Sequence, residues 1–336
     1  MATVGNTYLT IADLRKRQDR NDEIATIIEL LAEINPILQD MPVEQCNQGA
    51  THLTTVRTGL PSATWRKLYE GVQPSKSTTK QVTDTTGSLE AWSEIDSKLV
   101  RLSQNPAQFR LTEAQAFLEA MSQEMATGLF YHDTATAPEK FMGLAPRFND
   151  PTAENGSQLV DGGGSGSDNT SIWFTVWGNR TLHGIYPAGE NAGLQREDLG
   201  KETKEDDGKL YQVHREKFEW DLGLSLRDWR YVVRLCNVDV NDLNATATSD
   251  SADLHDLMIT AYYKLHQRKV AGGNAVIYCN TTVKEFLHKQ MLKANNNTFL
   301  RMREWQGEEV LSFLDMPIRE VDALVNTEAA VTGFST

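Results

Sequence analysis

The spacing of apolar residues predicts different structures in successive parts of the chain. Between Thr10 and Gln39 the spacing is helical until Pro36 interrupts it, so we expect one or two helices there. The region from about Thr51 to Asp96 is rich in Thr, Val and Trp. Apolar and polar residues alternate in parts of it, for example at 63–69, and two Gly/Pro segments interrupt it. This pattern predicts a long, twisted β-hairpin.

The predicted hairpin has too few apolar side chains to fold alone. Neither face of its strands is continuously apolar, residues 75–81 are almost all polar, and an isolated two-stranded hairpin is only marginally stable in water. We therefore expect it to need a partner surface. An ordinary surface hairpin on the parent domain is the alternative.

The clearest helix signal runs from Thr112 to His132. Thr112 is the expected N-cap, with Gln115 three positions later. The apolar stripe expected to face the core begins with Phe117, Leu118, Met121 and Met125. Methionines on such a stripe usually fill a core.

The remainder of the chain predicts mixed strands and helices. The Gly/Ser-rich residues 161–168 predict a flexible connector and a boundary. Apolar runs between Ser171 and Val240 predict strands, as do Ala275–Cys279 and the tail from Val310 to Val325. Helical spacing returns from Ala252 to Gln267 and from Thr281 to Lys293. The expected fold class is α+β.

Composition indicates a globular protein and argues against several kinds of function. The chain has 336 residues, 40% of them hydrophobic, and a net charge of −13, which disfavours specific binding of nucleic acid. No leader or membrane-spanning segment is evident, so we expect a soluble cytoplasmic protein. Cys46, Cys236 and Cys279 lack metal or redox spacing and are expected to be buried thiols.

Candidate chemistry is absent from the sequence patterns. The histidines lack metal-ligand spacing, and the glycines at 162–166 are not followed by the Lys-Ser/Thr of a phosphate loop. Glu202, Glu205, Asp206 and Asp207 sit among lysines and end in a turn signal, which favours a solvated loop. We predict no catalytic residue, no metal site and no cofactor.

The order of elements resembles a known family. A long hairpin, one long helix, a PEKFMGL turn at 138–144 and a late AVIYCNTT strand–helix at 275–282 follow one another. This order is similar to that of the tailed-bacteriophage major capsid proteins with the Hong Kong 97-like fold. Residues 55–61 through 73–76, and residues 168–173, are similar to those of short-tailed phages in particular.

The resemblance implies a division of the chain into parts. An N-terminal arm would span 1–50 and an extended hairpin loop 51–98. A peripheral domain with the long spine helix would span 99–160, and mixed strands with the axial domain 161–309. Residues 310–336 would return to the peripheral domain and form the C-terminal tail.

The resemblance also implies a function and partners. The chain would assemble as hexamers and pentamers into the icosahedral head around double-stranded DNA, made in the host cytoplasm and ending in the virion. A separate scaffolding protein, the portal and a possible decoration protein would be partners, with only non-specific proximity to DNA and no membrane. The alternatives are an encapsulin-like nanocompartment shell and a carbohydrate-binding or carbohydrate-active domain that uses the tryptophans.

Contacts between subunits are expected on the hairpin. Its candidate contact residues are Arg57, Trp65, Arg66, Lys67, Lys76 and Lys80. Some family members crosslink through a hairpin lysine, and Lys67, Lys76 and Lys80 lie in the corresponding region. We favour solvated lysines here.

Overall fold

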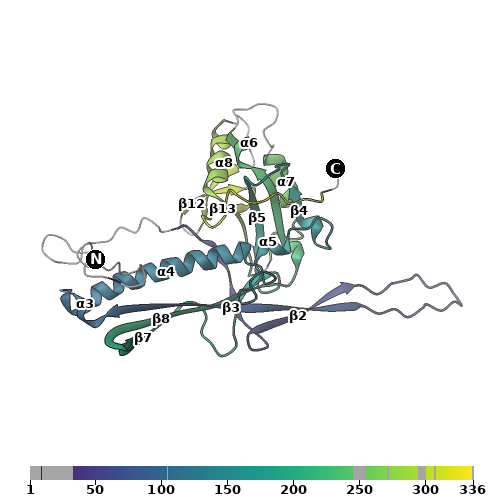
Figure 1. The fold of residues 1–336 in the computed structure, drawn as a ribbon. Coiled ribbons are helices and arrows are strands. Elements are labelled where there is room, and N and C mark those ends of the chain that lie inside the picture. Colours follow the sequence, from purple (N-terminus) through teal and green to yellow (C-terminus); the bar gives the residue numbers. More distant parts are fainter. Residues whose placement is uncertain are drawn as a thin grey trace.

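The computed structural model describes residues 9, 33–103, 105–244, 254–270, 272–293, 300–305 and 308–334. Figure 1 shows an elongated lower layer, in which helix α4 lies along strands β3 and β8, and a mixed upper part. A hairpin formed by β2 and β3 projects from the lower layer well beyond the rest of the molecule. Most of the helices predicted between Thr10 and Gln39 fall outside the described residues, within which Ile37–Asp40 form the short helix α2.

The described helices are short apart from α4, α7 and α8. In chain order they are α2 (Ile37–Asp40), α3 (Ser97–Leu102), α4 (Pro106–Tyr131), α5 (Leu144–Arg147), α6 (Val240–Asn244), α7 (Leu254–Lys264) and α8 (Thr281–Lys293), with 3₁₀ turns at Gly156–Gln158 and Trp229–Tyr231. Helix α8 matches its predicted range and α7 lies inside its own. Helix α4 starts earlier than predicted, because Asn105 accepts a hydrogen bond from Gln108 N at 3.2 Å and Pro106 occupies the first turn. The prediction of Thr112 as N-cap was therefore wrong, and its hydroxyl donates to the Gln108 carbonyl inside the helix.

The strands form one continuous, branched sheet. They are β1 (Val43–Gln45), β2 (Thr51–Gly59), β3 (Thr78–Asp96), β4 (Leu159–Asp161), β5 (Asn169–Trp177), β6 (Leu182–Tyr186), β7 (Gln195–Asp206), β8 (Lys209–Leu226), β9 (Val232–Asp239), β10 (Asn274–Cys279), β11 (Leu300–Trp305), β12 (Glu308–Phe313) and β13 (Met316–Glu320). The main path runs β11-β12-β13-β10-β5-β6-β8-β3-β2. Strand β8 joins the two parts, because its end pairs with β6 and the remainder pairs with β3.

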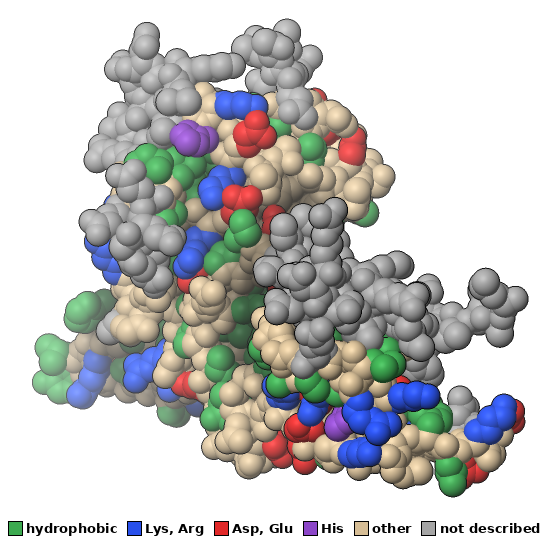
Figure 2. All heavy atoms as spheres, turned by 90° about the vertical axis from the view of Figure 1, so that its left-hand side faces the viewer, with side chains coloured by type: hydrophobic (Ala, Val, Ile, Leu, Met, Phe, Trp, Pro, Cys, Tyr) green, Lys and Arg blue, Asp and Glu red, His purple; other side chains and the backbone are tan. Residues whose placement is uncertain are grey.

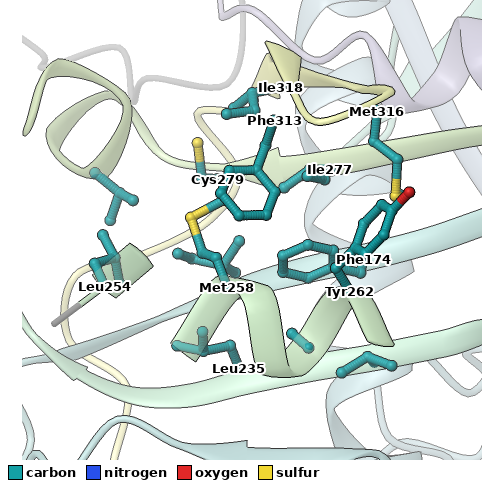
Figure 3. Packing of buried hydrophobic residues seen from close by; sticks show 14 of the residues in the cluster. Phe174, Leu235, Leu254, Met258, Tyr262, Ile277, Cys279, Phe313, Met316 and Ile318 are labelled. Atoms are coloured by element: carbon teal, nitrogen blue, oxygen red, sulfur yellow. The ribbon is translucent and has the colours of Figure 1, made fainter. Parts of the chain in front are cut away.

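The upper part packs around strands that are buried on both faces. Every residue of β5 is buried, as expected for a central strand covered on both sides. On one side, Met258 and Tyr262 of α7 meet Phe174, Ile277 and Phe313, as Figure 3 shows. On the other side, the aromatic rings of Trp173, Trp177 and Tyr278 pack against the C-terminal end of α4.

Two further segments differ from their sequence predictions. Residues 161–168 do not form a free connector, since Gly162 N and Gly164 N donate to Cys236 O and Asn237 O at 2.8 Å and a side chain at either glycine would collide with Asn237. The acidic stretch around Glu202 is strand β7, paired with β8 along its length, rather than a solvated loop. The predicted turn at Asp207 is present, with positive φ at Asp207 and Gly208.

Candidate subunit-interaction surface

The root of the hairpin is part of the folded body. Strand β2 pairs with Thr78–Thr85 of β3, and the rest of β3 continues along β8. Asp84 accepts a hydrogen bond from Arg147 Nη1 at 2.9 Å, and Arg147 also donates to Leu224 O at 2.9 Å. The Asp84 side chain is buried (4% exposed), and the Arg147 side chain is largely so (11% exposed). The hairpin therefore leaves the body from a fixed base.

The tip of the hairpin, residues 60–77, contains no strand, so the alternation at 63–69 did not predict its structure correctly. Four large apolar or aromatic side chains there are almost fully exposed: Leu60 (80%), Trp65 (99%), Leu68 (88%) and Tyr69 (102%). Single exposed apolar residues are common, but a group of this size is typical of an interaction site. Aromatic residues are enriched at protein interfaces because they combine a large apolar area with polar groups.

A local turn shapes this tip. Glu70 N donates to Lys67 O at 3.2 Å, Arg66 Nε donates to Glu70 O at 3.2 Å, and Tyr69 adopts a φ of 66°. The Lys67 and Glu70 side chains approach to 3.9 Å, but both are well exposed, so this ion pair contributes little stability. Ser75 Oγ donates to Ser62 O at 2.9 Å and connects the two sides of the loop. The tip thus has some structure of its own without any apolar core.

The outer hairpin has the opposite charge to the chain. Residues 53–83 contain five basic residues (Arg57, Arg66, Lys67, Lys76 and Lys80) and one acidic residue (Glu70), whereas the whole chain carries −13. Among the described residues, Arg57, Lys76 and Lys80 form no ion pair. Figure 2 shows basic and acidic side chains interspersed on the lower part of the opposite end of the molecule. The outer hairpin is therefore a locally basic element on an acidic protein.

The structure does not gather the six predicted contact residues into one site. Arg57 lies opposite Thr79 in the register and Lys80 lies opposite Val56, which places Arg57 and Lys80 on different faces of the ribbon. Trp65, Arg66 and Lys67 lie at or beside the tip turn. Sequence reasoning did not single out Leu60, Leu68 and Tyr69 as contact residues, although apolar residues between Gly/Pro breaks were the available signal.

The residues predicted for the core stripe of α4 lie in two clusters. Met121 (3% exposed) packs with Phe218 of β8, and Phe117 and Leu118 are half-buried against the same cluster. Met125 (2% exposed) belongs to the upper cluster with Trp173 and Trp177. Helix α4 thus connects the lower layer to the upper part.

Ion pairs reinforce the lower layer on β3, β7 and β8. Glu94 accepts from Arg215 at 2.7 Å and from Lys204. Burial raises the pKa of Glu94, but the hydrogen bonds from Lys204 and Arg215 outweigh burial and leave that pKa below its usual value. Glu216 is buried and accepts from Arg110 at 2.5 Å and from Arg196 at 2.7 Å. These pairs account for charges that would otherwise be unpaired within the layer.

The described residues give no support to several other kinds of site. In the part of the chain that the structure describes, no group of three or more His, Cys, Asp or Glu residues is arranged to hold a metal ion. A carbohydrate site lined by the tryptophans of β5 is unsupported, because Trp173 and Trp177 are at most 1% exposed. None of the described helices is both long enough and apolar enough to span a membrane.

Comparisons with known proteins agree on one class. The profile of the family described as major capsid protein GP7 matches residues 19–332. A chain of the near-atomic cryo-EM structure of bacteriophage Epsilon15 is 38% identical with a TM-score of 0.79, covering 99% of this chain and 100% of its own. The bacteriophage JBD30 capsid is 10% identical with a TM-score of 0.52, covering 94% and 99% respectively. No curated protein sequence matches.

The fold is therefore that of a tailed-phage capsid protein, the Hong Kong 97-like fold expected from the order of elements. The chain belongs to the major capsid protein GP7 family. A subunit of the SrpI encapsulin from Synechococcus elongatus PCC 7942 is similar only at a TM-score of 0.44 and 11% identity, too little to support the nanocompartment alternative.

Proposed function

We propose that this major capsid protein builds an icosahedral head from hexamers and pentamers, and that the outer hairpin is the element that reaches a neighbouring copy. The observation that carries the proposal is the tip itself, where Trp65 and Tyr69 are fully exposed on a basic ribbon. A second copy of an acidic chain supplies opposite charge for such a ribbon. Rings of identical subunits close through heterologous contacts, in which one patch of a copy binds a different patch of the next copy.

The division into parts is also proposed, although its boundaries at 98/99 and 309/310 fall inside α3 and β12. The arm is assigned to 1–50, the extended hairpin loop to 51–98 and the peripheral domain with α4 to 99–160. Residues 161–309 are assigned to the mixed strands and axial domain, and 310–336 to the return and tail. Strand β13 pairs with β10 in the upper part, so the peripheral assignment of the final segment depends on residues after β13. The contact of Glu328 with Tyr131 at the end of α4 supports that assignment.

We assign the chain a structural role without a catalytic step. The proposed partners are further copies of the chain, a scaffolding protein, the portal and, in heads that carry one, a decoration protein, with assembly in the host cytoplasm. Contact with packaged DNA is non-specific in this proposal, since a net charge of −13 repels phosphates at range. Lys67, Lys76 and Lys80 are assigned to non-covalent contacts.

Replacing residues 60–77 with a two-residue Asn-Gly turn tests the proposed contact. We expect the variant subunit to fold with unchanged thermal stability but to form no shells, as judged by electron microscopy of the protein produced with its scaffolding partner. In the wild-type protein, the amide hydrogens of residues 54–82 should exchange with solvent quickly in the free subunit and slowly in particles, because protection depends on buried contacts.

The matched point variants are Trp65→Ala with Tyr69→Ala at the tip, and Leu210→Ala as a control near the start of β8, where Leu210 is 70% exposed. The tip variant should reduce shell yield at least tenfold and the control should not. Wild-type yield from the tip variant, with equal amide protection in free subunits and particles, would contradict the proposed contact.

A further inference from the structure

Two buried histidines face each other at the root of the hairpin. His52 lies on β2 and His183 on β6, with ring centroids 5.7 Å apart and ring planes at 83°. His183 is fully buried and His52 is 5% exposed. Neither residue takes part in the contact surface described above, and both rings retain nitrogen atoms without a hydrogen-bond partner.

Charged groups from β1, from β3 and from the residue that follows β8 surround this histidine pair. Arg227, just after β8, approaches His52 Nε2 at 3.0 Å and Glu44 of β1 at 3.0 Å. The same Glu44 oxygen lies 3.5 Å from His183 Nε2. Asp84 of β3 lies opposite His52 in the hairpin register but is bound by Arg147 of α5. The Glu44 carboxylate is therefore shared by Arg227 and His183, while His52 contacts the same Arg227.

The pair lies where the hairpin root and the preceding segment join the body. Strand β1 runs parallel to β6, with Glu44 opposite Ile185, and Gly184 N donates to Pro42 O at 2.8 Å. Only residues 46–50 separate β1 from β2, and the Asn47 side chain in this turn makes two hydrogen bonds of 2.8 Å to the Leu53 backbone of β2. A change at the histidine pair thus acts on β1 and β2 together.

We propose that the His52–His183 pair is an acid-operated release for the hairpin root, in which proton uptake loosens β1 and β2 from β6 and Arg227. An arginine can only donate, so His52 Nε2 must accept from Arg227 and cannot be protonated while that contact lasts. A protonated His183 competes with Arg227 for Glu44. Protonation of either histidine therefore places a second positive charge beside Arg227. Among the described residues, Glu44 is the one nearby carboxylate left to balance both charges, because Asp84 is bound by Arg147.

The electrostatics fix the direction of the effect. Burial, followed by the Arg227 and His52 charges, lowers the pKa of His183 to about 3. Burial and Arg227 also lower the pKa of His52, although Glu44 and Asp84 act in the opposite sense. An unperturbed histidine titrates near 6.5. The neutral histidine pair therefore stabilises the closed hairpin root fully above about pH 6.5. This stabilisation is lost as the pH falls, because the histidines take up protons when the root is open and not when it is closed.

This release deepens the proposed function by regulating the hairpin, yet it is a property of the single subunit. Linkage for His183 alone predicts that lowering the pH from 7.5 to 5.0 favours the opened root about thirtyfold. Amide protection factors of residues 44–53 in the soluble wild-type subunit, corrected for intrinsic exchange rates, should fall by at least that factor. Those of β9 should change much less.

The His183→Gln variant should lose this acid response, with His183→Asn as the substitute if the first variant does not fold. The control variant, His288→Gln, changes an exposed histidine of α8 and should respond like the wild type. A root whose protection is independent of pH in the wild type, or falls equally in the His183 variant, overturns the inference. Either of these results would leave the proposed contact between hairpin tip and neighbouring copy intact. Conversely, a hairpin root that responds to pH, in subunits that never form shells, would contradict the proposed contact but not the acid response.

Discussion

Arg147, the last residue of α5, and Asp84 of β3 connect the segment after α4 to the hairpin root. Their side chains meet at 2.9 Å with 11% and 4% exposure, and Arg147 makes two further hydrogen bonds to the carbonyls of Met142 and Leu224. A buried arginine that is bound on several sides positions its partners more strictly than an exposed ion pair does. The position of the hairpin relative to α4 depends on this contact.

Arg147→Leu should destabilise the subunit by about 3–5 kcal/mol, because it leaves the Asp84 carboxylate buried without its counter-ion. Urea unfolding of the soluble subunit measures this change. Asp84→Asn combined with Arg147→Leu should recover part of the loss. The matched control is Arg230→Leu, which breaks the Asp228–Arg230 pair, where the arginine is 47% exposed, and should cost less than about 1 kcal/mol. Equal losses for the two single variants would show that burial of Asp84 is unimportant.

Met121→Asp should cost more than about 3 kcal/mol and leave largely insoluble protein, because Met121 is 3% exposed and packs on Phe218. Ala120→Asp changes the adjacent, exposed position on the same helix and should leave solubility and thermal stability nearly unchanged. The comparison of soluble yield and unfolding midpoint tests the orientation of α4. A soluble Met121→Asp variant that assembles at wild-type yield would contradict the packing of this face.

The three cysteines should be unreactive in the native subunit. Burial raises the pKa of Cys236 and that of Cys279 to about 12, and burial with the Asp84 charge raises the pKa of Cys46. Only the thiolate reacts with a disulfide reagent such as Ellman's, so at pH 8 no thiol should titrate before unfolding, and three should titrate in denaturant. Rapid modification of any one of them in the folded subunit would show that its site opens.

Local patterns predicted those elements whose signals lie within a few residues. The range of α8 was predicted correctly, and the Asp207–Gly208 turn was recognised from its dipeptide. The start of α4 was also encoded locally, in Asn105–Pro106, but the later Thr112 signal was chosen instead. These features depend on capping and turn preferences, which neighbouring residues determine.

Strand β7 and residues 161–168 could not be assigned in this way. Strand β7 carries almost no apolar residues, and its strand conformation comes from pairing with β8 and from ion pairs such as Glu202 with Arg215. The glycines at 161–168 look flexible in sequence but fit against Asn237, a residue distant in the chain. Their structure depends on contacts that local propensity does not encode.

The sequence by itself determined the α+β class, the long helix, the unsupported hairpin and the order of elements that identifies the capsid family. Each of these follows from periodicity, turn residues and charge, which are local properties. Only the tertiary structure decided which side chains the hairpin exposes, that Arg147 binds Asp84 at its root, and that the rings of His52 and His183 meet edge to face. Residues 131 positions apart meet there because β6 pairs with the end of β8, while β2 pairs with the part of β3 next to it, and such long-range contacts depend on the packing of the whole chain.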